Sequence, residues 1–230
     1  MKSLYLGYQP IYDIHNNIHG YELLYRDSLS GIKDFPGNIE ATVDVISKIS
    51  CGLVDSDLFE KGCRLFINCE HNIAESNMIR ELDKDKFVIE ILETTQPDEE
   101  FLNTIKELHE EGYVFALDDF DCSPETLKYF YKVFQYLTYI KVDIMDIQKD
   151  KFKFMIPIFK KAGLKVITER VETLAEVEEF IEAGTDFLQG FYLCKPKVII
   201  KKECPFIIGS AESIMCKRLE EMGITKHLVK

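Results

Sequence analysis

Two patterns alternate along the chain: short apolar runs rich in β-branched and aromatic residues, and longer segments in which apolar residues recur every three or four positions. The first pattern is typical of buried strands, and the second of amphipathic helices that cover them. Their regular alternation predicts βα units and a parallel sheet. The expected strands span residues 4–12, 18–25, 64–68, 87–92, 114–118, 139–143, 165–169 and 187–188.

Several helix ends can be read from capping residues. Asp98 precedes an amphipathic stretch, and Ser123 stands before a proline that suits the first helical turn. Thr173 and Glu176 have the spacing of a capping box, and Gly184 is placed to end the same helix. Further helices are expected at residues 40–54, 152–161 and 210–222.

These elements predict an α/β fold, a TIM-like (β/α)8 barrel, and the length of 230 residues suits one such domain. Asn16 and Asn17 offer turn chemistry between the first two strands, so we expect an N-terminal β-hairpin. Too few residues follow Pro196 for a second ordinary domain. We expect the barrel to span residues 1–200, and residues 201–230 to form a C-terminal appendage with one amphipathic helix.

The formal net charge is −12, from 40 acidic and 28 basic residues. This balance argues against binding of a nucleic acid polymer through a basic face. An acidic protein that acts on an anionic phosphate needs local positive charge, which bound Mg²⁺ or Mn²⁺ would supply. The apolar start of the chain is too short for a signal peptide or membrane span, so we expect a cytoplasmic protein without membrane insertion. The seven cysteines lack zinc-site spacing and are expected to be reduced thiols.

Polar residues stand within or just after the predicted strands, about one βα unit apart. In a parallel barrel the carboxyl ends of the strands meet at one rim, which is where such folds place their active sites. Carboxylate and amide oxygens are hard ligands that suit Mg²⁺, Mn²⁺ or Ca²⁺. The residues concerned are Asn68, Glu90, Asp118, Asp119, Lys141, Glu169 and Gln189.

Each of these positions also has a purely structural interpretation. An acid at a strand end can be the N-cap of the next helix, and this applies to Asp118 as well. Glu90 and Lys141, however, interrupt runs that otherwise look buried, and a buried charge needs a partner. For Lys141 that partner could be Asp143 or a neighbouring glutamate. For the acids, two metal ions would relieve the mutual repulsion and activate a water molecule.

Eight short motifs carry these residues: QPI at 9–11, GYELLYR at 20–26, FIN at 66–68, EILE at 90–93, LDDF at 117–120, IKVD at 140–143, TERVET at 168–173 and QGF at 189–191. Their order resembles that of the EAL-domain cyclic di-GMP phosphodiesterases. The resemblance runs from about Tyr8 to Pro196 and is greatest for EAL barrels of the subgroup fused to HD-related output domains.

The resemblance implies an EAL-type barrel that is a cyclic-guanylate-specific phosphodiesterase in bacterial second-messenger signalling. Its activity would be metal-dependent hydrolysis of cyclic di-GMP to linear pGpG by two-metal phosphodiester cleavage. Two Mg²⁺ or Mn²⁺ ions would bind per site, with Ca²⁺ inhibitory, and a homodimer is implied by analogy. The implied metal ligands are Glu22, Asn68, Glu90, Asp118, Asp119 and Glu169.

Further roles are implied in the same way. Lys141 would orient or help to activate the attacking water, and Gln189 would support a water at the metals. Glu93 would steady the loop after Asp119. The residues implied to bind the substrate are Gln9, Arg26 and Glu172.

Three departures from the family pattern leave a second function open. Leu23 replaces an alanine, Arg170 replaces a usual glycine, and Phe120 is followed by the sequence DCSPE instead of a glycine-rich loop. The first hypothesis is therefore an active phosphodiesterase. The alternative is a catalytically weak or inactive EAL-like receptor that binds cyclic di-GMP or a protein partner. A barrel hydrolase or lyase with another phosphorylated substrate is a third hypothesis.

Overall fold

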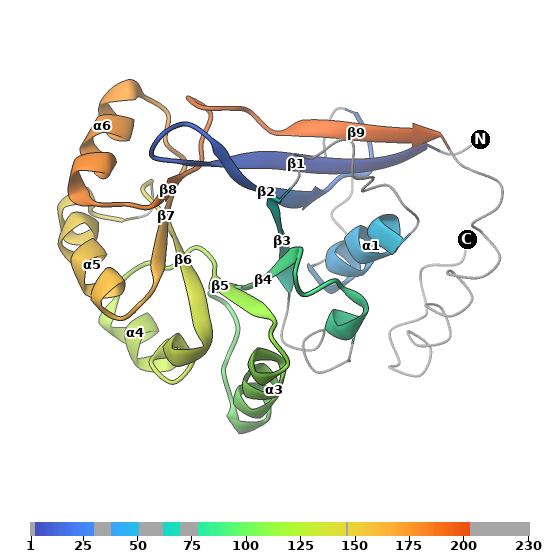
Figure 1. Cartoon of the computed structure of the whole chain (residues 1–230), viewed down its shortest axis with the longest axis horizontal. Coiled ribbons are helices and arrows are strands. Elements are labelled where there is room, and N and C mark those ends of the chain that lie inside the picture. Colours follow the sequence, from blue (N-terminus) through green and yellow to red (C-terminus); the bar gives the residue numbers. More distant parts are fainter. Residues whose placement is uncertain (1–2, 30–37, 51–61, 70–77, 146, 203–230) are drawn as a thin grey trace.

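The computed structural model describes residues 3–29, 38–50, 62–69, 78–145 and 147–202. Within these residues, strands β1 to β8 close into a barrel, and a ninth strand pairs with β1 outside it (Figure 1). Strands β2 to β8 run parallel to one another, while β1 is antiparallel to its neighbours β2 and β8. The predicted TIM-like barrel with an opening hairpin is confirmed.

The strands lie close to their predicted positions. Three of them begin and end where the sequence predicted, and the others differ by one or two residues at an end. Their bounds are β1 Ser3–Asp13, β2 Ile18–Tyr25, β3 Arg64–Cys69, β4 Phe87–Ile91, β5 Val114–Leu117, β6 Leu137–Asp143, β7 Lys165–Glu169, β8 Phe187–Leu188 and β9 Lys197–Lys202.

The capping residues predicted from the sequence are in place. Asp98 accepts a hydrogen bond from the Phe101 amide at 2.9 Å. Thr173 and Glu176 form a reciprocal capping box, and Gly184 ends that helix with φ of 97°. The helices are α1 Asn38–Ser50, α3 Glu99–Glu110, α4 Pro124–Phe130, α5 Lys149–Lys161 and α6 Leu174–Ala183, with short 3-10 turns at Met78–Glu81 and Phe134–Tyr136.

Strand β9 was not predicted. Its apolar residues, Val198 to Ile200, are bracketed by lysines, so neither pattern used to find the other strands is present. Pairing with β1 stabilises it in the structure, from Ser3 opposite Lys202 to Tyr8 opposite Lys197. The expected helix at 210–222 lies outside the described residues, and the division at residue 200 stays a prediction.

The interior of the barrel is apolar in one layer and polar in the next. Side chains two residues apart on a strand share a face. Phe66 is therefore followed inside the barrel by Asn68, Val88 by Glu90, and so on around the ring. The apolar layer forms its own buried cluster, made of Ile11, Phe66, Val88, Ala116, Tyr139, Ile167 and Phe187. The same spacing places Gln9, Asn68, Glu90, Asp118, Lys141, Glu169 and Gln189 in the layer above it.

His19 contacts the apolar layer from the start of β2. Its ring stacks on Phe187 with the centroids 3.9 Å apart, and its Nε2 lies 2.9 Å from the Tyr139 hydroxyl. Burial lowers the pKa of His19 from 6.5 to about 4, and the nearby cations Lys165 and Arg64 add to the effect. Asp13 opposes it only weakly.

We expect the fold to lose about 1–2 kcal/mol of stability through His19 between pH 6.5 and pH 4. This figure is discounted for the partial exposure of the ring. The unfolded chain binds a proton on this histidine at higher pH than the folded chain does, so the stability is complete above pH 6.5 and declines as the pH falls. Urea unfolding at pH 7 and pH 4.5 should show a smaller pH effect in His19→Gln than in the wild type. The exposed His15→Gln is the control, and equal pH effects in all three proteins would contradict this assignment.

Candidate active site and metal centre

Lys141 lies at the centre of the polar layer and is completely buried. Its Nζ is 2.7 Å from an oxygen of Glu90 and 2.7 Å from one of Asp118. It is also 3.1 Å from Glu169 Oε1 and 3.8 Å from Glu22 Oε1. Four strands therefore contribute carboxylates to a single ammonium group. Of the two partners considered from the sequence, a neighbouring glutamate is correct, because Asp143 pairs with Arg170 instead.

Two glutamines complete the layer on the side of β1. Gln189 donates from Nε2 to Glu22 Oε2 at 2.6 Å and to Gln9 Oε1 at 3.2 Å. Gln9 in turn donates to the carbonyl of Cys194 at 2.9 Å. The amides thus fix one face of Glu22 and join the two ends of the described barrel, β1 and the loop after β8.

Burial makes ionisation of these carboxyl groups unfavourable. Burial raises the pKa of Glu90 and Glu169 well above the usual value, and Lys141 opposes this. Burial and the charge of Asp118 raise the pKa of Asp119 to about 6. Burial alone would lower the pKa of Lys141, but the surrounding carboxylates outweigh it and raise that pKa well above the usual range. If all of these carboxyl groups were ionised, the layer would carry more negative charge than Lys141 neutralises, and the raised pKa values reflect that cost.

The donor set fits divalent hard cations. Asp118, Asp119 and Glu169 each offer an oxygen within 4.8 Å of the others. Asn68 Oδ1 and Glu169 Oε2 are buried and accept no hydrogen bond from the described residues. A buried oxygen without a donor is costly, and a cation would remove that cost. With Glu22 and Glu90, five carboxylates face one ammonium group, an excess of negative charge that two divalent ions would balance.

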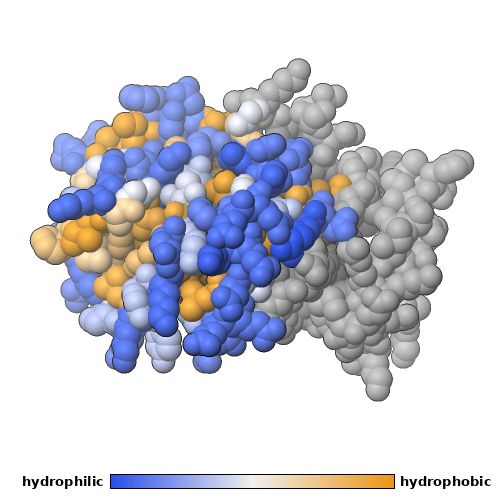
Figure 2. Space-filling view, turned by 60° about the horizontal axis from the view of Figure 1, so that its bottom comes forward, coloured by the Kyte–Doolittle hydropathy of each residue, from blue (hydrophilic) through white to orange (hydrophobic). Residues whose placement is uncertain are grey.

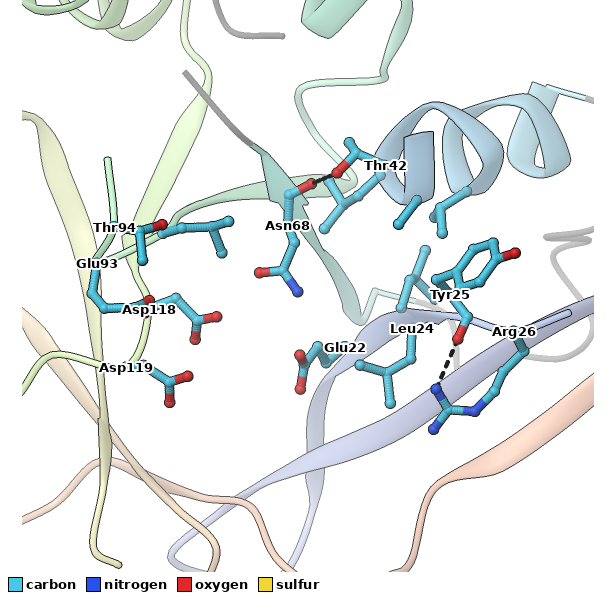
Figure 3. A pocket seen from close by; sticks show the side chains of 15 residues that line it. Glu22, Leu24, Tyr25, Arg26, Thr42, Asn68, Glu93, Thr94, Asp118 and Asp119 are labelled. Atoms are coloured by element: carbon cyan, nitrogen blue, oxygen red, sulfur yellow. Dashed lines mark hydrogen bonds between the residues drawn. The ribbon is translucent and has the colours of Figure 1, made fainter. Parts of the chain in front are cut away.

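Two cavities open beside this layer and share Glu22, Asp118 and Asp119 in their walls. The larger, of about 360 Å³, extends toward α1 and is partly apolar. Figure 3 shows the side chains of Glu22, Asn68, Asp118 and Asp119 facing a common space in it. The smaller, of about 200 Å³, lies over Lys141, Glu169 and Gln189.

The remaining predicted residues lie at different distances from this centre. Arg26 lines the larger cavity and donates from Nη1 to the Tyr25 carbonyl at 2.7 Å (Figure 3). Glu93 lines the same cavity, and partial burial raises its pKa. Glu172 is exposed and is not among the residues that line either cavity. Its role in substrate binding stays a prediction.

Sequence reasoning missed several side chains of these cavities. Thr42 on α1 donates its hydroxyl proton to the Asn68 carbonyl at 2.8 Å and lines the larger cavity. Thr94 and Tyr25 lie there too, and Phe191 lines the smaller one. No sequence signal marks Thr42, because its role depends on how α1 packs against β3. Phe191 was in a motif but was given no role.

Gly190 is expected to be essential for the placement of Gln189. A Cβ at this position would lie 2.1 Å from the Val171 carbonyl oxygen and 2.3 Å from the Val171 nitrogen. Because those are backbone atoms, the segment that follows β8 would have to move away from the segment that follows β7. We expect Gly190→Ala to lower the free energy of unfolding by about 2–3 kcal/mol, measured by urea unfolding.

Gly163→Ala is the control that separates the effect of a steric clash from the effect of backbone strain. Gly163 has φ of 86° but nothing within 4 Å of an added Cβ. Its replacement should cost only about 1 kcal/mol. A Gly190→Ala protein as stable as Gly163→Ala would contradict the close approach to Val171.

A family model described as the EAL domain matches residues 54–196. The chain belongs to the EAL domain family. This EAL domain is 31% identical over 202 residues to the cyclic di-GMP phosphodiesterase CdgJ of Vibrio cholerae, an alignment that covers 86% of this chain and 46% of CdgJ. The chain thus spans about half the length of the curated relatives it matches.

Solved EAL structures share the fold. An EAL domain protein from Listeria monocytogenes aligns with a TM-score of 0.66 at 21% identity, covering 85% of this chain and 89% of that one. BlrP1 of Klebsiella pneumoniae, solved as a manganese and cyclic di-GMP complex, aligns with a TM-score of 0.67 at 21% identity, covering 87% of this chain and 57% of that one. Among the described residues of this EAL domain, no helix is both long and apolar enough to span a membrane.

Proposed function

We propose that this EAL domain is a cyclic di-GMP-specific phosphodiesterase that hydrolyses one phosphodiester of the cyclic dinucleotide to give linear pGpG. One observation carries the proposal: carboxylates from separate strands meet around Lys141 in one pocket, with Glu90 and Glu169 both in contact with its Nζ. A single salt bridge would stabilise the fold equally well and would bury fewer charges, so it would cost less desolvation free energy. The convergence of several carboxylates therefore points to a function other than stability.

The side chains proposed to hold two Mg²⁺ or Mn²⁺ ions are Glu22, Asn68, Glu90, Asp118, Asp119 and Glu169. When bound, such ions lower the pKa of water and stabilise negative charge that develops on a phosphoryl group. Lys141 is held among four carboxylates, so its position is fixed. If divalent ions took up these carboxylates, the N–H groups of Lys141 would be available to the attacking water or to a phosphoryl oxygen. Gln189 donates from Nε2 to Glu22 and Gln9, and its buried Oε1 would accept a hydrogen bond from a water at the metals.

The shape of the site suits a dinucleotide. The two cavities share Glu22, Asp118 and Asp119 in their walls, so a scissile phosphate bound at these residues would have one cavity on each side of it. Arg26 lines one cavity and Gln9 the other, where each can contact phosphate. The names of relatives agree with this substrate, because CdgJ is a cyclic di-GMP phosphodiesterase and BlrP1 was solved with manganese and cyclic di-GMP.

A receptor that binds cyclic di-GMP without hydrolysing it is the second candidate. The loop after Asp119 favours it, because the sequence DCSPE follows Phe120 in place of a glycine-rich loop. Asp119 and Cys122 adopt positive φ values of 44° and 54° there. Phe120 and Cys122 in this loop are buried, and Phe120 packs edge-on against Phe134 and Phe159. The loop is therefore anchored in the core, which would hold Asp119 in one position.

Hydrolysis and binding should be measured side by side. We expect turnover of cyclic di-GMP to pGpG with Mn²⁺ or Mg²⁺, and binding without turnover when Ca²⁺ replaces them. Tight binding in Ca²⁺ with no product in Mn²⁺ would favour the receptor. Turnover of another phosphodiester in preference to cyclic di-GMP would favour a different hydrolase on the same fold.

A homodimer stays a prediction. Figure 2 shows hydrophobic side chains exposed among hydrophilic ones toward the left, on the side of helices α4 to α6 in Figure 1. On α5, Phe154 is 73% exposed and Ile158, one turn later, is 48% exposed. Sedimentation of the wild type and of Phe154→Ser at matched concentrations would test whether this face joins two copies.

A further inference from the structure

Arg170, in the wall of the smaller cavity, has a backbone conformation that is unusual for an arginine. It follows Glu169 at the end of β7 and has φ of 54°, a left-handed conformation that glycine adopts without strain and arginine does not. Its side chain is 57% exposed and lines the cavity together with Lys141, Glu169 and Gln189. An arginine in a strained position beside Lys141 and Glu169 points to a function for its side chain.

Asp143 fixes the direction of this side chain. Arg170 Nε lies 2.6 Å from Asp143 Oδ2, and Asp143 is almost completely buried at the end of the neighbouring strand β6. The other oxygen of Asp143 accepts a hydrogen bond from the Met145 amide at 2.8 Å. The carboxylate is therefore held by its own loop, and its ion pair with Nε holds the Arg170 guanidinium at the wall of the cavity.

The charge of Arg170 is opposite to most of its surroundings in the cavity. Glu22, Asp118, Asp119 and Glu169 all line the same walls, and Lys141 is engaged by carboxylates beneath them. A dianionic cyclic dinucleotide that enters this cavity must pass a rim of like charge. An exposed guanidinium there offers several N–H donors in a plane that matches two oxygens of a phosphate.

We propose that Arg170 binds a non-bridging oxygen of a substrate phosphodiester, positioned for this by Asp143. The proposal rests on the proposed function. Because the contact exists in the ground state as well as in the transition state, Arg170 sets the KM and the binding affinity more than kcat.

Arg170→Gly tests this with little risk to the fold, because glycine suits the left-handed backbone. With Ca²⁺ present, calorimetry should show binding of cyclic di-GMP weakened by roughly tenfold to a hundredfold relative to the wild type. In Mn²⁺ the KM should rise by a similar factor while kcat changes by less than about threefold. Asp143→Asn should weaken binding less than Arg170→Gly does, and should add little further loss in the double variant.

Arg80→Gly is the matched control. It removes an arginine whose Nη2 lies 2.6 Å from Glu111, and neither residue lines the two cavities of the site. Its KM and affinity should equal those of the wild type. Wild-type activity with an unchanged KM in Arg170→Gly would overturn the role of Arg170 and leave the proposed function standing. A fall in kcat alone would also overturn it, and a wild type that neither binds nor hydrolyses cyclic di-GMP would overturn both.

Discussion

Lys141→Met is expected to lower the free energy of unfolding by about 3–5 kcal/mol when divalent cations are removed with a chelator. Among the residues that the structure describes, Lys141 is the single cation in contact with Glu90, Asp118 and Glu169, and methionine has a similar volume but no charge. The buried carboxylates would then repel one another without compensation, or would have to take up protons. Urea unfolding at pH 8 with and without chelator measures the loss.

Divalent cations should restore much of the stability of this variant. Mn²⁺ or Ca²⁺ in excess over its dissociation constant stabilises a folded protein that binds it by mass action. The variant should nevertheless turn over cyclic di-GMP at least about a hundredfold more slowly, because it has lost a positioned donor. Lys153→Met is the control: its ion pairs with Asp150 and Glu179 are solvent-exposed, so we expect a much smaller loss than in Lys141→Met. Equal losses in the two variants would contradict the central place of Lys141.

The polar layer could be predicted because the strand period fixes it. Once Phe66, Val88 and Ile167 are assigned to the barrel interior, the residues two positions later must share that interior and lie nearer the carboxyl end. A charge such as Glu90 within an apolar run is then visible as a site from the sequence alone. The convergence on Lys141 confirms that these residues come together, while their roles stay proposals.

Features that depend on packing between distant segments could not be predicted. Thr42 reaches the site because α1 packs beside β3, a relation that no local pattern encodes. Strand β9 forms because the edge of β1 is available for pairing, and its own lysine-rich sequence gave no signal. Arg170 was noticed only as a departure from a family pattern. Its pairing with Asp143 depends on β6 and β7 lying side by side, which no local pattern in the sequence encodes.

Glu169→Gln is expected to reduce turnover of cyclic di-GMP in Mn²⁺ by roughly 10³-fold, the effect of losing about 4 kcal/mol of stabilisation of developing charge. Glutamine keeps the shape of the side chain but lacks the negative charge. In the wild type, Glu169 Oε2 is buried and accepts no hydrogen bond from the described residues. Without cations, the variant should be as stable as the wild type or more so, because the substitution removes a carboxylate whose pKa is raised by burial and by the charges of Asp118, Glu22 and Asp119.

Glu169→Gln should lose activity while keeping its stability, whereas a variant that folds poorly would lose both. Addition of Mn²⁺ or Ca²⁺ should raise the melting temperature of the wild type and of Glu178→Gln, an exposed charge change on α6, but should raise that of Glu169→Gln much less. A cation-induced shift in Glu169→Gln equal to that of the wild type would show that this carboxylate is no ligand. The cations would then be held by the other carboxylates without Glu169. Absence of any shift in the wild type would mean that protons balance the negative charge around Lys141, and the metal-dependent mechanism would fail.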